Sequence, residues 1–328
     1  MKRYRIAGHS VASQVELPEL AMEPGTEPPD VVMAKMERAV EVVEEAYPEE
    51  DFAPRDFLRR RDGALPTHSL RTPAGMRLRL DTGVRRIEFA GDDLPRTPLT
   101  HALIDFALPC LLSSSSDAVL HGALLESGGS CVAVLGESGS GKSTLAAAWL
   151  ERGHRFMGDD WFVLSTGADG LLAHASHPSI RLRWEDERLV ALGATSARGP
   201  MPGFSKRWYS FAPDGPAFHG QPAPLRAVVL LSRVQGPEQG FRSRTPDSQE
   251  SLRGLLSATI CLEMNSAGRW STLLPLLAEV ERKVAIRVLS VGDVAAQSGA
   301  IVKEIEELLC RETGPDERSS AGSGRNSG

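Results

Sequence analysis

A glycine-rich segment near the middle of the chain has the residue types and spacing of a phosphate-binding loop. The sequence GESGSGKS at positions 136–143 fits the pattern G-x-x-x-x-G-K-[ST] in full. Its glycines allow the backbone to curl so that N–H groups converge on phosphate oxygens, and a helix that follows adds its positive end. Lys142 is placed to reach the outer phosphates of a nucleotide, and the Ser143 hydroxyl to bind Mg²⁺.

The elements on either side of this loop are those that the chemistry requires. Cys131–Leu135 is an apolar run that predicts a buried strand, and Lys142–Arg152 is predicted to be a helix that stops at Gly153. The order of strand, loop and helix therefore predicts a nucleotide site. The residues predicted to contact the nucleotide are Gly136, Glu137, Ser138, Gly139, Ser140, Gly141, Lys142, Ser143 and Thr144.

Two adjacent carboxylates, Asp159 and Asp160, follow one predicted helix and one short predicted strand after the loop. We expect this chain order to return them to the sheet edge beside the phosphates. One carboxylate there can hold Mg²⁺. The other can accept the proton of an attacking hydroxyl, a role worth roughly 10²–10⁴ in rate.

Basic residues further along the chain are weaker candidates for the same site. Lys206 and Arg207 follow a predicted loop at Gly199–Gly203, and together they are candidates for a clamp on the transferred phosphoryl group. Arg181 and Arg183 alternate along a predicted strand, where they face either solvent or an acceptor. Trp149 and Trp270 lie at helical spacing among apolar residues and are predicted to be core.

The first 96 residues read as a small, mostly β accessory domain. Met76–Phe89 consists of two alternating runs around Asp81-Thr82-Gly83, which predicts a β-hairpin. Val31–Ala46 fits strand, helix or both, and Arg59–Arg61 is predicted to be a solvated turn.

Residues 97–311 mix strands and helices, which predicts an α/β catalytic domain. The apolar segment 97–112 has helical spacing broken at Pro109, and it contains a charged residue, Asp105. Residues 312–328 are polar and rich in glycine and serine, and they are predicted to be a disordered tail.

Composition narrows the functional classes. The net charge of −6 gives no basic footprint, so we expect no nucleic-acid partner. The first residues lack the apolar core of a secretion signal, and no run reaches the roughly 18 apolar residues that span a bilayer. The four cysteines show no C-x-x-C spacing, which favours reduced thiols. A cytoplasmic protein with no membrane contact is expected.

The segment 120–164 resembles the catalytic core of the HPr kinase/phosphorylase family. Shared features are Leu120-His121-Gly122, the loop at 136–143, the sequence RGHR at 152–155 and the pair Asp159-Asp160. The resemblance implies a P-loop kinase fold with a mixed sheet, akin to that of phosphoenolpyruvate carboxykinase. It also implies use of ATP and Mg²⁺, a serine acceptor on a small protein, and a homo-oligomer.

Carried over by position, the resemblance implies a role for each acidic residue. Asp159 resembles the catalytic base that activates the acceptor serine, and Asp160 the second acidic residue near the metal. His121 resembles the histidine that sits beside the base. His154, within RGHR, is predicted to be structural.

The sequence departs from the family pattern at three places. Thr144 stands where bacterial HPr kinases usually have a glutamate, and the downstream glutamate motif is not recognisable, with Glu185 and Glu187 in a predicted helix as its nearest candidates. The N-terminal segment YRIAGHSVASQVELPEL is more similar to stand-alone HPr-kinase-like proteins, some of which phosphorylate precursor peptides. HPr as the substrate and the reverse, phosphorylase reaction therefore remain open.

The sequence thus predicts an ATP-dependent serine kinase that acts on a peptide or small protein, with Asp159, His121 and Lys142 as catalytic residues. Two alternatives remain. One is a kinase of a small metabolite, and the other is a regulatory nucleotide-binding protein without catalysis.

Overall fold

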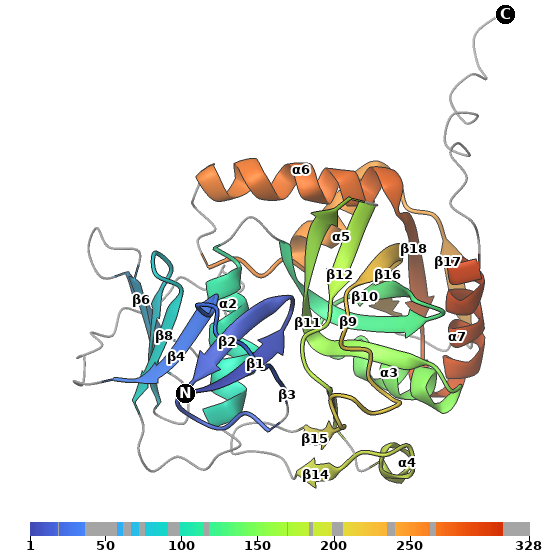
Figure 1. Ribbon diagram of the computed structural model, residues 1–328. Helices are drawn as coiled ribbons and strands as arrows, with labels where there is room; N and C mark the ends of the chain where they lie inside the picture. Colours follow the sequence, from blue (N-terminus) through green and yellow to red (C-terminus); the bar gives the residue numbers. More distant parts are fainter. Residues whose placement is uncertain are drawn as a thin grey trace, which may run out of the picture.

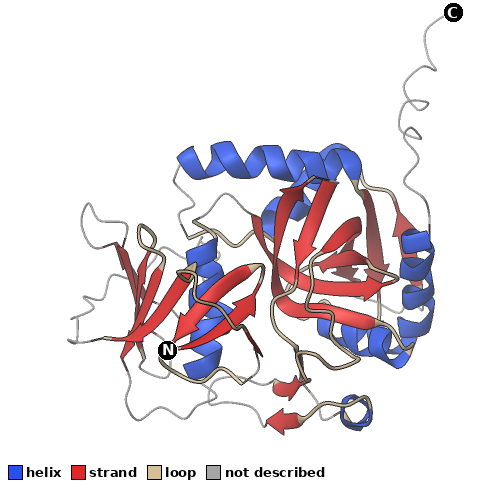
Figure 2. Cartoon of the chain, viewed as in Figure 1, coloured by secondary structure: helices blue, strands red, loops and turns tan. Residues whose placement is uncertain are grey.

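The computed structural model describes residues 1–18, 20–36, 58–61, 67–71, 76–90, 99–114, 118–168, 170–183, 186–198, 206–234, 240–262 and 267–310. Over these residues the chain is a mixed α/β protein with three sheets (Figure 1). Helices lie on the outside of the second, seven-stranded sheet (Figure 2). Among the described residues, no helix combines the length and the apolar character needed to cross a bilayer.

The N-terminal sheet has the strand order β3-β1-β2-β4-β8-β7-β6-β5. Its strands β7 and β8 pair antiparallel from Arg77↔Ala90 to Asp81↔Arg86, which confirms the predicted hairpin. Leu78 and Leu80 are buried, while the residues that alternate with them along β7 are partly exposed, as expected for a strand with one covered face. The strands are β1 (Lys2–Ile6), β2 (His9–Ser13), β3 (Ala21–Met22), β4 (Val31–Lys35), β5 (Leu58–Arg61), β6 (Thr67–Arg71), β7 (Arg77–Asp81) and β8 (Arg86–Ala90).

A helical segment covers this sheet and also reaches the second one. It consists of a π-helix, η1 (His101–Ala107), followed by α2 (Leu108–Leu112). Pro109 is the second residue of α2, and Ala107 and Leu108 before it have helical backbone angles, so the predicted break is a change from π- to α-helix within one continuous segment. The segment belongs to one apolar core with the N-terminal sheet and with Trp161 and Val163 of the second sheet.

The second sheet has the order β10-β9-β11-β12-β16-β18-β17, and β10 also pairs with β16. The strands β10, β9, β11, β12 and β16 therefore close on themselves. Parallel pairing joins β10 to β16 and β16 to β18. The strands are β9 (Ala118–Ser127), β10 (Ser130–Leu135), β11 (Arg155–Gly167), β12 (Gly170–His174), β16 (Ala223–Arg233), β17 (Phe241–Arg244) and β18 (Ala285–Val291).

Four helices pack on this sheet. Buried residues of the helices and of the sheet together form an apolar core that is larger than the one around η1. The helices are α3 (Lys142–Glu151), α5 (Ser248–Ser257), α6 (Ala267–Lys283) and α7 (Val294–Cys310). Trp149 is fully buried and Trp270 packs against the same core, as predicted. His154 stacks on Trp149 at 4.1 Å between ring centroids and contacts Glu306 of α7, so it has structural contacts.

A third sheet has three strands in the order β13-β15-β14. Its strands are β13 (Ser179–Leu182), β14 (Ser196–Arg198) and β15 (Arg207–Ser210). A short helix, α4 (Glu187–Ala191), follows β13, and the Asp186 carboxylate caps it by accepting a hydrogen bond from the Arg188 N–H.

Several expectations about local structure were wrong. Asp159-Asp160 was expected between two short strands, but β11 runs without a break from Arg155 to Gly167. Arg59–Arg61 lies in strand β5 rather than in a turn. The strand predicted at Arg181 and the helix predicted at Glu187 are confirmed, by β13 and by α4 respectively.

Other expectations fall on residues that the structure does not describe. These are residues 37–46 of the segment that begins at Val31, Glu185, the loop 199–203 and the tail 312–328. The division of the chain at residue 96 stays a prediction.

Candidate functional site

The glycine-rich loop connects β10 to α3 and adopts a conformation that requires glycine. Gly136, Gly139 and Gly141 have φ angles of +153°, +85° and +108°. A side chain on Gly136 would place its Cβ 2.3 Å from the carbonyl oxygen of Leu231, and backbone at this distance cannot yield. The loop therefore packs directly against β16 and delivers Lys142 and Ser143 as the first residues of α3.

Lys142 is buried against its own loop. It is 7% exposed, and its Nζ donates hydrogen bonds to the carbonyl oxygens of Gly136 at 2.7 Å and Glu137 at 3.0 Å. Burial lowers the pKa of Lys142, and the positive charge of Lys206 lowers it further, while Asp159 and Asp160 act in the opposite direction. The ammonium group thus lies at the mouth of the loop with both aspartates nearby.

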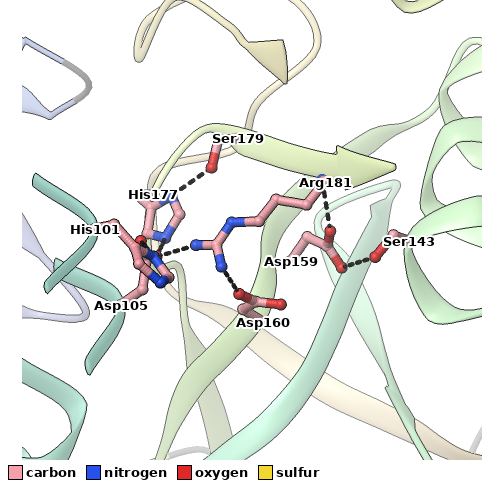
Figure 3. Close-up of polar contacts among 8 residues, drawn as sticks. All are labelled: His101, Asp105, Ser143, Asp159, Asp160, His177, Ser179 and Arg181. Carbon is pink, nitrogen blue, oxygen red and sulfur yellow. Dashed lines mark hydrogen bonds and ion pairs between the residues drawn. The ribbon is translucent and has the colours of Figure 1, made fainter. Parts of the chain in front are cut away.

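Asp159 connects the strand β11 to the loop. It is 1% exposed, and its Oδ1 accepts a hydrogen bond of 3.1 Å from the Ser143 hydroxyl. Its Oδ2 accepts another, also of 3.1 Å, from the backbone N–H of Arg181 (Figure 3). The sequence expectation that the aspartates return to the phosphate loop is confirmed for Asp159 by this contact.

Asp160 has an unusual backbone conformation for a residue within a strand. Its φ is +117°, a region that residues with a side chain rarely adopt. Consecutive side chains of a regular strand point to opposite faces, and this distortion lets both carboxylates approach Arg181. The Arg181 guanidinium forms an ion pair with Asp160, as Figure 3 shows.

The two carboxylates differ in their affinity for a proton. Burial and the neighbouring charge of Asp160 raise the pKa of Asp159 above its usual range. Burial acts the same way on Asp160, but the positive charge of Arg181, with a further contribution from Lys206, outweighs it and lowers that pKa. The pair therefore contains one carboxylate that stays ionised and one that accepts a proton more readily.

His121 lies on β9, opposite Trp161 of β11, and hydrogen-bonds a backbone group of Asp160. Burial and the positive charge of Lys142 lower its pKa to about 4. At neutral pH the imidazole is therefore uncharged. The structure thus brings together His121, Lys142, Ser143, Asp159 and Asp160.

Of the two candidate clamp residues, the structure brings Lys206 to this group. Its charge contributes to the pKa values of His121, Lys142 and both aspartates. Arg207 is the first residue of β15 and stands opposite Leu182 of β13.

Among the other predicted loop residues, Glu137 and Ser138 are exposed and Thr144 is partly buried. Ser140 is 4% exposed, and within the described part of the chain its hydroxyl has no hydrogen-bond partner. Arg183 is exposed beside the loop, with Nη2 3.7 Å from the position that a Cβ on Gly139 would occupy.

Sequence reasoning missed two buried residues near the aspartates: Arg181, which contacts them, and Asp105, which contacts Arg181. Arg181 was expected to face solvent or an acceptor, but it is 6% exposed and faces Asp160 and Asp105. The Asp105 side chain is 1% exposed. A lone charge in an apolar helical segment was a signal for this pairing, because buried carboxylates are paired in nearly all proteins.

The donor set at this site fits Mg²⁺ that is shared with a nucleotide. Mg²⁺ is usually held by one or two carboxylates together with waters and substrate phosphates. Ser143, Asp159 and Asp160 supply a hydroxyl and two carboxylates. Within the described ranges, no cluster of three or more histidine, cysteine, aspartate or glutamate residues could hold a metal on its own.

Comparison with known proteins confirms the resemblance to HPr kinase/phosphorylase. The chain is 33% identical over 106 residues to the HPr kinase/phosphorylase of Treponema pallidum, in the Nichols strain and in a second strain of the same organism. The match covers 31% of this chain and 33% of the relative, so the chain spans about a third of the length of the curated relatives it matches. No family model matches the chain.

Among solved structures, the Hpr(Ser) kinase/phosphatase from Coxiella burnetii matches 58% of this chain and 97% of its own, at 12% identity and a TM-score of 0.30.

Proposed function

We propose that this chain is an ATP-dependent phosphotransferase of the HPr-kinase-like kind, which transfers the γ-phosphate of Mg-ATP to a serine hydroxyl. The observation that carries the proposal is the hydrogen bond between Ser143 and Asp159. This bond joins Ser143, the position at which a phosphate loop binds Mg²⁺, to Asp159, the carboxylate proposed to accept the proton of the acceptor hydroxyl. The limited similarity to HPr kinase/phosphorylase supports the same reaction class.

The nucleotide is assigned to the loop 136–144. The α3 N-terminus would face the phosphates, and Lys142 would exchange its contacts with the Gly136 and Glu137 carbonyls for the outer phosphates. Mg²⁺, when bound, neutralises charge on the phosphates. Ser143 and Asp160 are the residues assigned to it, as in the P-loop kinase fold that the family shares with phosphoenolpyruvate carboxykinase.

Asp159 is assigned as the general base. Its raised pKa and its buried position suit a carboxylate that removes a proton from an acceptor hydroxyl. His121 is uncharged at neutral pH and hydrogen-bonds a backbone group of Asp160, so it would help to hold the aspartate pair in position. Lys206 is assigned to the transferred phosphoryl group, where a positive charge stabilises the transition state.

The contact between Ser143 and Asp159 also allows the two aspartates to exchange roles. In that arrangement Asp159 holds the metal and Asp160 accepts the proton. Substitution distinguishes the two. Loss of the metal ligand raises the Mg²⁺ concentration needed for half-maximal transfer, whereas loss of the base lowers the transfer rate at saturating Mg-ATP.

The acceptor is proposed to be a peptide or small protein, including a precursor peptide, and the enzyme to be a cytoplasmic homo-oligomer. The test is incubation of the purified protein with Mg²⁺ and γ-labelled ATP in a lysate of its host. Asp159→Asn is the test variant, and Asp214→Asn, at an exposed position, is the matched control.

Label on one small protein or peptide, absent only with Asp159→Asn, supports the proposal. Label on a metabolite identifies a small-molecule kinase instead. ATP binding without any transfer identifies a regulatory nucleotide-binding protein.

A further inference from the structure

Arg181 contacts both aspartates of the proposed site, through two different groups. Its backbone N–H donates to Asp159 and its Nη1 forms an ion pair with Asp160. The side chain is held away from solvent, with its guanidinium carbon 4.5 Å from the ring centroid of Trp208. Its position therefore fixes where both carboxylates lie.

The other end of the Arg181 guanidinium is held by Asp105. Its Nη2 lies 2.5 Å from Oδ1 of Asp105 and forms an ion pair with it. Asp105 also contacts Nδ1 of His101 at 2.9 Å and Nε2 of His177 at 2.5 Å. Burial alone would raise the pKa of Asp105, but the charges of Arg181 and His177 hold it well below its usual range.

The chain Ser179, His177 and Asp105 has the order of a hydrolase triad, since His177 also contacts the Ser179 hydroxyl at 2.9 Å. Ser179 and His177 are each only 2% exposed, so no substrate reaches the hydroxyl. The cluster is therefore a fixed support for Asp105 rather than a second reaction centre.

Asp105 comes from η1, outside the segment that carries the phosphate loop and the aspartates. The residues around it, including Leu103, Ile104 and Phe106, share a core with the N-terminal sheet. A charged pair without solvent tolerates little displacement, because an unpaired buried charge is costly. The packing of η1 on the N-terminal sheet thus determines the position of Arg181.

We propose that Asp105 and Arg181 are positioning residues for phosphoryl transfer, with Asp105 of η1 fixing Arg181 and Arg181 fixing Asp159 and Asp160. The inference deepens the proposed function and rests on it. It gives the N-terminal sheet a role, because that sheet holds the helix from which the reacting carboxylates are aligned.

The kinetic test uses Asp105→Asn, which keeps the side-chain shape and removes the charge, and Arg181→Lys, which keeps the charge and loses the fork that spans two carboxylates. For both we expect kcat for phosphoryl transfer to fall by about tenfold or more, since misplacement of reacting groups is costly. The Kd for ATP measured without Mg²⁺ should change by less than about threefold, because both residues act on the carboxylates rather than on the loop. Asp214→Asn is the control and should leave both quantities unchanged.

Non-additivity provides the second kinetic criterion. If Asp105 acts through Arg181 on Asp160, the variant Asp105→Asn/Asp160→Asn loses little more activity than Asp160→Asn alone. Additive losses, or an unchanged kcat in Asp105→Asn, overturn the inference. If Asp105→Asn does not fold, His101→Gln, which weakens only one contact of Asp105, replaces it with the same criteria.

A spectroscopic readout separates this inference from the proposed function. The indole N–H signal of Trp208, assigned with Trp208→Phe, should shift in Asp105→Asn without nucleotide, because the Arg181 guanidinium lies over that ring. An unmoved signal overturns the inference. Absence of transfer by the unmodified protein overturns the proposed function, and the Trp208 signal still decides whether Asp105 positions Arg181.

Discussion

The hydroxyl of Ser143, in the first turn of α3, donates a hydrogen bond of 3.1 Å to Oδ1 of Asp159 in the interior of β11. The glycine-rich loop at 136–143 and the paired carboxylates therefore lie together. Arg181 holds the other oxygen of Asp159 through its backbone N–H. Each oxygen of the Asp159 carboxylate thus accepts a hydrogen bond from the protein itself.

Lys142 is expected to be essential for nucleotide binding. In Lys142→Met we expect the Kd for ATP to rise about tenfold or more, because a hydrogen bond to a charged group contributes roughly 1.5–3 kcal/mol. Lys303→Met removes an exposed lysine of α7 and serves as the control. Titration calorimetry measures the Kd of both variants. An unchanged Kd for Lys142→Met would contradict the assignment of the loop as the nucleotide site.

Gly136→Ala is expected to damage both the fold and the site. The new Cβ would meet the Leu231 carbonyl oxygen, so we expect a loss of roughly 2 kcal/mol or more in the free energy of unfolding. Gly170→Ala is the control, since Gly170 has a φ of +119° but no neighbour within 4 Å of an added Cβ. Urea denaturation should show the larger loss for Gly136→Ala, and equal losses would contradict the close approach of loop and β16.

The two candidate clamp residues are expected to differ. Lys206→Ala should lower kcat about tenfold or more, because its positive charge would stabilise the transferred phosphoryl group. That charge already shifts the pKa values of His121, Lys142 and both aspartates. Arg207→Ala should leave kcat within about threefold of the unmodified protein. Steady-state transfer assays on both variants test this, and a larger effect at Arg207 would reverse the assignment.

His121 is expected to make the ligand-free protein less stable in acid. Its pKa falls from 6.5 to about 4 on folding, so the unfolded chain binds more protons between these values. Stability from this residue is therefore present above pH 6.5 and is lost as the pH falls toward 4, by at most roughly 3 kcal/mol.

In His121→Gln the free energy of unfolding should consequently decline less between pH 6.5 and pH 4 than in the unmodified protein. Urea denaturation at several pH values gives this slope. An identical decline in the two proteins would contradict a lowered pKa of His121 in the folded state.

Local signals predicted much of the fold. The hairpin of β7 and β8 and the succession of β10, loop and α3 follow from alternation, turn residues and glycine spacing, which depend on neighbours in sequence. The continuity of β11 did not follow, because Asp159-Asp160 resembles a turn. Pairing with β9 overrides that preference, at the expense of a strained φ at Asp160.

The candidate site was predicted where its residues are close in sequence and missed where they are distant. His121, the loop and the aspartates lie within one short stretch. Arg181 and Asp105 join it only through tertiary packing of β13 and η1. Asp105 alone carried a readable signal, as a charge in an apolar segment, but nothing in the sequence named its partner.

The most direct test of the account is the rate of transfer to the acceptor by Asp159→Asn, measured together with its affinity for Mg-ATP. We expect the rate at saturating Mg-ATP to fall roughly 10²–10⁴-fold, the contribution of a general base, while the affinity stays within about threefold. Transfer at an unchanged rate would contradict the assignment of Asp159 as the base of a phosphotransferase.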